Sequence, residues 1–83
     1  MLTVSVVSPE RTLFEGEASS VVAPAFDGQV GILPMHAPML TLLGTGELRL
    51  EAAGGERRFA IVGGFLEVAD DRVRVVTERA EAK

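Results

Sequence analysis

Hydrophobic residues alternate with polar ones along most of the chain, and the repeat is two residues rather than 3.6. Residues 2–7 already alternate in this way, and β-branched side chains are plentiful throughout. No segment gives a convincing amphipathic helix, and residues 78–83 favour a helix but are too few to hold one alone. Short strands with frequent turns predict an all-β fold, either a sandwich or a barrel.

Three dipeptides typical of tight turns divide the alternating segments into predicted hairpins. The turns are Asp27-Gly28, Gly54-Gly55 and Asp70-Asp71, and the first is a favoured type I′ sequence. These registers place apolar residues opposite apolar residues on one face, and a one-residue slip would move every side chain to the wrong face. The predicted pairs are Ala25–Val30, Ala23–Ile32, Leu50–Phe59, Leu48–Ile61, Leu66–Val75 and Val68–Val73, with Glu51–Arg58 and Glu67–Arg74 on the other face.

The segment from residue 28 to residue 39 breaks the alternation with a glycine-rich turn and two prolines, Pro34 and Pro38. Proline fixes φ, removes a hydrogen-bond donor and pushes the preceding residue towards extended geometry. Residues 34–38 are therefore predicted to form a stiff, irregular loop that holds His36 near the surface. Rigid loops on a scaffold are common places for recognition.

His36 is the only histidine, and three roles are open to it. A contact with a partner is favoured over a structural hydrogen bond within the loop. A general base needs an oriented partner and a nucleophile within reach, and nothing nearby in the sequence supplies them. One histidine without cysteine is also a poor start for a zinc site, so catalysis and metal binding rank last.

The methionines and glycines of the chain also admit more than one role. Met35 and Met39 either cover the core beneath the loop or act as adaptable apolar contacts for a partner. Asp27 and Gly28 with Gly31 could cradle a phosphate, but no Gly-Lys-Ser/Thr follows, so these residues are assigned to a turn. The pair at 63–64, Gly63 and Gly64, is predicted to mark a bulge or a close backbone approach.

Charge and composition exclude several classes of ligand and site. The net charge of −4 argues against a nucleic-acid surface, and the lack of cysteine excludes disulfides and thiolate metal sites. Dispersed carboxylates are expected on solvated strand faces, and no metal or cofactor is predicted. No apolar run approaches the ~20 residues of a membrane-spanning helix. The start of the chain has no secretory pattern, and 83 residues suggest a single domain.

Several segments together resemble the epsilon subunit of F-type ATP synthases. The loop carries the Gly-Ile-Leu-Pro run at 31–34 followed by His-Ala-Pro at 36–38, as in that family. Residues 6–16 resemble its opening, and residues 63–68 resemble its Gly-Gly-x-Leu-Glu-Val strand, which residues 73–77 follow as in the family. The segments stand in the family's order and cover nearly the whole chain, so the resemblance is specific.

The resemblance implies the family's N-terminal domain, an antiparallel sandwich of two sheets with about ten short strands, over residues 1–83. The family's C-terminal helical hairpin has no counterpart in this sequence, so its inhibitory and ATP-binding roles are not carried over. What remains is a non-catalytic rotor component of the central stalk, which packs on the gamma subunit and the c-ring to couple proton-driven rotation to ATP synthesis. No small-molecule substrate is expected. Membrane association is expected only through the complex, at the cytoplasmic face of a bacterial plasma membrane.

The family's contact loops map onto seven residues of this chain. Gln29 stands where many members carry an acidic residue, so a charge-assisted contact with the ring is expected to be weaker or absent. The predicted contacts are Gln29, Met35, His36, Pro38 and Met39, with Ser8 and Thr41 as weaker candidates.

Three other functions compete with the rotor hypothesis. A biotinyl or lipoyl carrier needs a lysine on an exposed hairpin, and the only lysine is Lys83 at the terminus. A small ligand-binding or hydrolytic sandwich using His36 would need a concave pocket with convergent polar groups. An oligonucleotide-binding barrel is disfavoured by the acidic balance and by the presence of only four aromatic residues.

Overall fold

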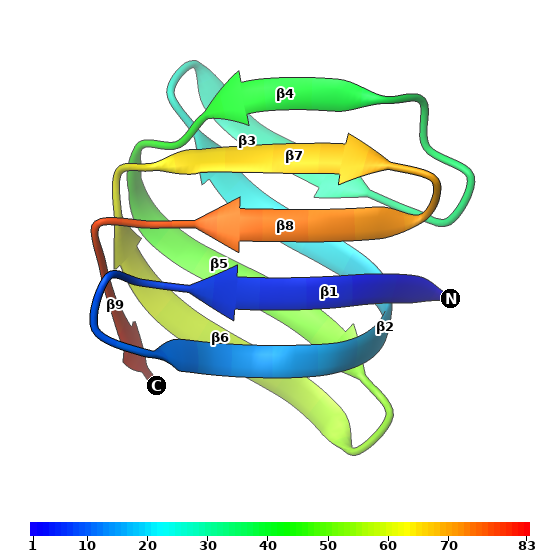
Figure 1. Cartoon of the computed structure of the whole chain (residues 1–83), viewed down its shortest axis with the longest axis horizontal. Coiled ribbons are helices and arrows are strands. Elements are labelled where there is room, and N and C mark those ends of the chain that lie inside the picture. The colour runs from blue at the N-terminus through cyan, green and yellow to red at the C-terminus, as the bar shows by residue number, and fades with distance from the viewer.

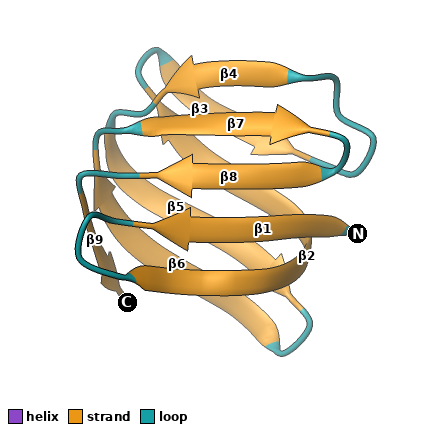
Figure 2. Ribbon diagram, viewed as in Figure 1, coloured by secondary structure: helices purple, strands orange, loops and turns teal.

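The computed structural model describes residues 1–83 and contains nine strands and no helix (Figure 2). The all-β prediction is confirmed, with nine strands where about ten were expected. The strands are β1 (Leu2–Val7), β2 (Thr12–Ala25), β3 (Gly28–Ile32), β4 (Met39–Leu42), β5 (Thr45–Ala52), β6 (Gly55–Val62), β7 (Phe65–Ala69), β8 (Arg72–Val76) and β9 (Arg79–Ala82).

One continuous ladder of strands folds over to make the two layers of a sandwich. The order is β4-β7-β8-β1-β2-β5-β6-β9, with β3 paired to β2. In Figure 1 the first layer, nearer the viewer, holds β4, β7, β8, β1 and the start of β2, and the second layer lies behind it. The 14-residue β2 belongs to both layers, and its register on β5 shifts between Ala18 and Val21. A bulge of this kind bends a strand and lets it pass between layers.

One pair departs from the antiparallel pattern that was expected. β1 and β8 run parallel, with Val4 opposite Val73 and Val6 opposite Val75. All four of these valines are buried in the core. β1 and β8, which come first and last along the chain among the strands of the first layer, therefore lie side by side although they are far apart in the sequence.

The hairpin at Asp70-Asp71 has the predicted register. Leu66 lies opposite Val75 and Glu67 opposite Arg74. Both aspartates have positive φ, 50° and 59°, as a type I′ turn requires.

The other two predicted registers were wrong by two residues. Ala23 lies opposite Val30 and Leu48 opposite Phe59, because the two turns are centred one residue earlier, at 26–27 and 53–54. In each hairpin the residue after the turn is a glycine with positive φ, Gly28 at 132° and Gly55 at 122°. Glycine is a preferred residue at this fourth position of a type I turn, so it did not mark the turn's centre.

The wrong registers still predicted the correct face for each side chain. A shift of two residues preserves the alternation of inward and outward positions, so the apolar residues remained on the buried side. The predicted ionic pair of Glu51 with Arg58 is absent, because Glu51 lies opposite Glu56 instead. Gly31 lies within β3 opposite Val22 rather than in a turn.

Sixteen buried apolar residues fill the space between the layers. Fifteen of them belong to seven strands, and the sixteenth is Leu43, which follows β4. Burial of such side chains contributes roughly 25 cal/mol for each Å² of apolar surface removed from water. The core residues are Leu2, Val4, Val6, Ala18, Val21, Ala23, Ile32, Leu43, Leu48, Leu50, Phe59, Ile61, Leu66, Val68, Val73 and Val75.

Gly63 and Gly64 lie at a close backbone approach, as predicted. A Cβ on Gly64 would collide with the carbonyl oxygen of Val76, and both glycines have positive φ. Beside them the buried hydroxyl of Thr77 lies 2.9 Å from the carbonyl of Gly63 and 3.1 Å from that of Val62. The β6–β7 connection is therefore fixed against the end of β8.

Candidate partner-docking surface

The proline-bounded loop connects β3 to β4 at the end of the sandwich that also carries the N-terminus and the β7–β8 turn (Figure 1). Residues 33–38 form no strand, which agrees with the predicted irregular loop. Met35 has a φ of 68° and a side chain that is 90% exposed. Its N–H donates a hydrogen bond of 2.6 Å to Oδ1 of Asp71. Pro38 is exposed and leads into β4.

His36 is half-buried in this loop. Its Nδ1 lies 2.7 Å from the carbonyl oxygen of Ala37, so Nδ1 carries the proton and donates it to that carbonyl. The structure gives the ring no hydrogen bond to a hydroxyl or a carboxylate. The ring therefore makes a structural hydrogen bond within the loop, one of the roles left open by the sequence, and its contact with a partner stays a prediction.

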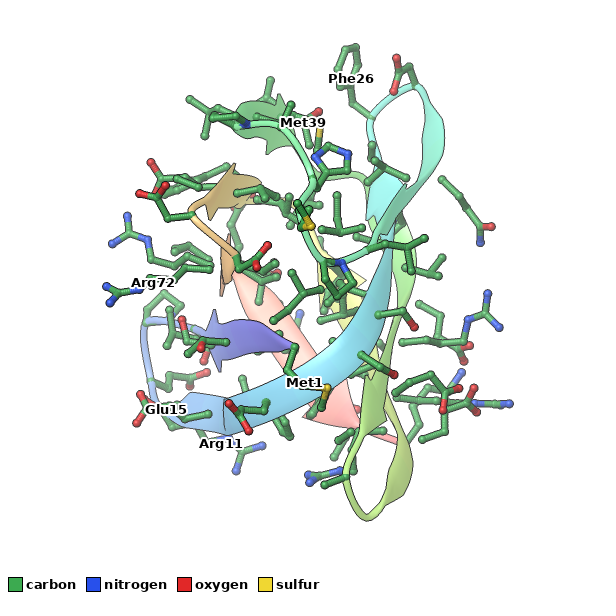
Figure 3. All side chains as sticks on the ribbon, turned by 90° about the vertical axis from the view of Figure 1, so that its right-hand side faces the viewer. Met1, Arg11, Glu15, Phe26, Met39 and Arg72 are labelled. Carbon is green, nitrogen blue, oxygen red and sulfur yellow. The ribbon has the colours of Figure 1, made fainter.

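The two methionines of the segment divide between the two roles that the sequence left open. Met39 is half-buried, lies at the start of β4 and packs against the core (Figure 3). Met35 takes no part in the core and faces solvent. Of the two, Met35 alone offers a free apolar side chain to a partner.

A line of apolar residues crosses the outer face of the first layer. Leu42 on β4 lies opposite Phe65 on β7, Phe65 lies opposite Val76 on β8, and Val76 lies opposite Val7 on β1. We call these four residues the apolar row. Because paired residues project to the same side of a sheet, their side chains are neighbours on one surface. The row is only partly covered by the chain itself, and Leu42 is 63% exposed.

The apolar row widens at the β4 edge into a shallow groove lined by Leu40, Thr41, Leu42 and Phe65. Leu40, 69% exposed, projects to the same side as Leu42. The guanidinium of Arg74 lies over the ring of Phe65, 5.6 Å from its centre, and 3.7 Å from the carboxylate of Glu67. An apolar strip bordered by paired charges has the anatomy of a protein-binding surface.

The remaining predicted contacts lie in separate places. Thr41 is on β4 and lines the groove, while Ser8 follows Val7 directly at the far end of the apolar row. The Ser8 hydroxyl donates a hydrogen bond of 3.3 Å to the Arg11 carbonyl within the β1–β2 turn. Gln29 is exposed on β3, which belongs to the second layer. The structure thus brings Met35, His36 and Pro38 together in the loop, whereas Thr41 lies with the groove and Ser8 and Gln29 lie on other elements.

The apolar row was not predicted from the sequence. One signal pointed to it, because residues 39–43 read Met-Leu-Thr-Leu-Leu and place large apolar side chains on both faces of β4. A strand with one face in water alternates apolar and polar residues, whereas a strand covered on both faces does not.

The outer face of the second layer has a different composition. Ion pairs join Glu47 to Arg49 at 3.9 Å, Glu47 to Lys83 at 3.2 Å, and Glu56 to Arg58 at 2.7 Å. We call these five residues the charged face. The hydrogen bond from Arg58 lowers the pKa of the Glu56 carboxyl below its usual value, and the same bond raises the pKa of Arg58. Figure 3 views the sandwich end-on, with the first layer on the side of Arg72 and Glu15 and the second layer opposite.

The chain brings together no group of three histidine, cysteine, aspartate or glutamate residues that could hold a metal ion. None of its elements is a helix of the length and apolarity needed to cross a membrane.

Comparison with known proteins gives one family over the whole chain. Residues 1–83 match the family model described as "ATP synthase, Delta/Epsilon chain, beta-sandwich domain". Similar curated proteins include the ATP synthase epsilon chain of Synechococcus sp. (strain JA-2-3B'a(2-13)), 44% identical over 80 residues that cover 96% of this chain and 58% of that protein. The ATP synthase epsilon chain of Brevibacillus brevis is 42% identical over 81 residues, covering 96% of this chain and 61% of its own length. The chain therefore spans only part of the relatives that it matches.

Solved structures show the same fold. A chain of the Euglena gracilis mitochondrial ATP synthase, solved with OSCP, F1 and c-ring, superposes with a TM-score of 0.89 at 24% identity, covering 98% of this chain and 52% of its own. A chain from the central stalk and c-ring of the Tetrahymena thermophila mitochondrial ATP synthase gives 0.80 at 17% identity, covering 96% and 65%. The β-sandwich predicted from the resemblance is therefore confirmed.

Proposed function

The chain belongs to the family of the ATP synthase delta/epsilon chain, beta-sandwich domain, and on that premise we propose that it is a non-catalytic central-stalk part of an F-type ATP synthase epsilon subunit. In this role it packs on the gamma subunit and touches the c-ring, and so helps to pass proton-driven rotation to the synthesis of ATP. It reaches the cytoplasmic face of a bacterial plasma membrane only through that complex. The whole of residues 1–83 acts as one rigid domain.

The apolar row is the observation that carries this proposal. Scattered apolar side chains are normal on a protein surface, but contiguous ones bordered by polar groups mark interaction sites. Leu42 of the row and the neighbouring Leu40 each leave most of their surface in water. We assign the row to the gamma subunit, whose binding would remove these side chains from water. Torque transfer requires a stiff body and a complementary patch rather than reactive groups.

The β3–β4 loop is assigned to the c-ring. The loop, which carries Met35, His36 and Pro38, lies at one end of the domain, outside the row, so one partner can cover the row while another meets the loop. Gln29 lies apart from this loop, at the start of β3, and its neutral amide would make a weaker hydrogen bond with the ring than a carboxylate would. In this proposal His36 contributes a contact and no proton transfer.

Co-elution with the gamma subunit of the same organism on a sizing column tests the proposal. We expect a stable one-to-one complex that survives moderate salt, since burial of apolar surface is not screened by ions. Two separate peaks, with both proteins folded by circular dichroism, would leave the family membership as a statement about fold alone.

A further inference from the structure

A single hydrogen bond joins the β3–β4 loop to another element of the protein. The Met35 N–H donates to Oδ1 of Asp71 at 2.6 Å, across 36 positions of the sequence. No other hydrogen bond links residues 33–38 to another part of the chain, since His36 bonds only to the adjacent Ala37 carbonyl. Among hydrogen bonds, this one alone ties the loop to the rest of the fold, and the two prolines add their own restriction of the backbone.

Asp71 is itself held firmly. It occupies the type I′ turn between β7 and β8 with a φ of 59°, and its main-chain carbonyl accepts a 2.9 Å hydrogen bond from the Thr3 N–H on β1. Its neighbour Asp70 shares the turn and the positive φ, but its side chain is exposed and makes no hydrogen bond. The two aspartates thus differ mainly in one contact, because only the Asp71 carboxylate accepts the hydrogen bond from Met35.

The bond accounts for the unusual backbone of Met35. A φ of 68° lies in the left-handed region, which residues other than glycine, asparagine and aspartate adopt rarely and only when their surroundings hold them there. A carboxylate that accepts an N–H provides such a hold, because charge-assisted hydrogen bonds are short and strong. The consequence is a Met35 side chain directed away from the core and 90% exposed.

We propose that Asp71 is a positioning residue that pins the Met35 N–H and so presents the Met35 side chain as a preformed apolar contact for the c-ring. The inference rests on the function proposed above, which assigns this loop to the ring. Fixing a contact residue in its bound geometry before binding reduces the entropy lost on association. The ring is then expected to offer a recess that accepts an unbranched, polarisable side chain.

The test compares Asp71→Gly with Asp70→Gly. Both substitutions leave the turn a sequence that tolerates positive φ, so both variants are expected to fold and melt like the parent. We expect Asp71→Gly to speed hydrogen exchange of the Met35 amide and to weaken binding to the isolated gamma–c-ring complex, each by about tenfold or more, the size expected for a charge-assisted hydrogen bond. Asp70→Gly should change both by no more than about twofold. Asp71→Asn, which keeps an oxygen acceptor, should keep the Met35 exchange rate and the affinity for the complex close to those of the parent.

Each part of the inference has its own failing result. Equal Met35 exchange in the two glycine variants would overturn the pinning. Faster exchange in Asp71→Gly with unchanged affinity for the ring would overturn its role in binding. If the parent chain itself fails to bind the gamma–c-ring complex, the function proposed above fails, and the exchange comparison alone then decides whether Asp71 fixes the loop.

Discussion

The two outer faces of the sandwich share one alternating pattern and differ in what occupies its outward positions. On the second layer these positions hold the charged face, where glutamates pair with arginines and a lysine. On the first layer they hold the apolar row at one end, from Leu42 to Val7, beside the charged pair of Glu67 and Arg74. The inward residues of both layers build the same core, so the core specifies the fold while the outward residues specify which face is covered.

The charged face is complete without a partner. Exposed ion pairs contribute little stability each, about 0–1 kcal/mol, but they keep a broad sheet surface hydrated. Arg49 and Arg58 lie directly opposite each other, an unfavourable like-charge pair that Glu47 and Glu56 offset. The apolar row has no such compensation within the chain, which is why we treat it as half of an interface.

The largest effect is expected at Gly64, whose backbone lies against the main chain of Val76, a residue of the apolar row. A Cβ there would meet the Val76 carbonyl oxygen at a φ of 103°, so Gly64→Ala must push β8 away from the β6–β7 connection. We expect a loss of at least about 3 kcal/mol in the free energy of unfolding, measured by urea denaturation. The matched control is Gly31→Ala, where a Cβ meets open space and the change should stay within about 0.5 kcal/mol. Similar losses in both variants would refute the close approach.

The next prediction separates the two faces directly by placing one charge on each. Leu42→Glu is expected to leave the melting temperature near that of the parent and to weaken gamma binding by at least about 2 kcal/mol, as at an interface hot spot. Val62→Glu is the control, because Val62 is an exposed valine, 43% accessible, at an outward position of β6 in the second layer. Equal losses of affinity, measured by titration calorimetry, would show that gamma does not distinguish the faces.

A smaller effect is expected at His36. His36→Ala removes a half-buried ring whose one hydrogen bond goes to the adjacent Ala37 carbonyl, so the fold loses little. We expect the affinity for the gamma–c-ring complex, measured by titration calorimetry, to weaken by about 1 kcal/mol. The melting curve should be unchanged. Unchanged affinity beside that unchanged curve would remove His36 from the interface. A lowered melting temperature would instead assign it to loop structure.

Local sequence signals predicted the elements that depend on neighbouring residues. Asp70-Asp71 gave the right register because both turn residues must tolerate positive φ. Gly28 and Gly55 misled the other two registers, since a glycine serves equally at the third or fourth position of a turn. The face predicted for each side chain was still correct, because the register error was an even number of residues. Prolines at 34 and 38 located the loop for the same local reason.

The apolar row could not be predicted in this way. Its four residues come from four strands, and Val7 joins Val76 only through the parallel pairing of β1 with β8. No local signal encodes that pairing, because the two strands meet through the folding of the whole ladder. The bond between Met35 and Asp71 was hidden for the same reason.

The smallest effect is expected at Glu56, and it tests whether the charged face stands apart from binding. Arg58 lowers the pKa of Glu56 in the folded protein. A carboxylate with a lowered pKa stabilises the fold above its unfolded pKa, and this stability is lost as the pH falls through the folded pKa. Glu56→Gln should therefore melt slightly below the parent at neutral pH and low salt.

That difference should vanish in acid, where the parent's carboxylate is protonated, and in high salt, which screens the exposed pair. Glu10→Gln is the control, because Glu10 is exposed and takes part in no ion pair. Affinity for gamma should be the same in both variants and the parent. If Glu56→Gln weakened gamma binding as strongly as Leu42→Glu, the charged face would belong to the interface, and the division of the domain into a covered and a solvated face would fail.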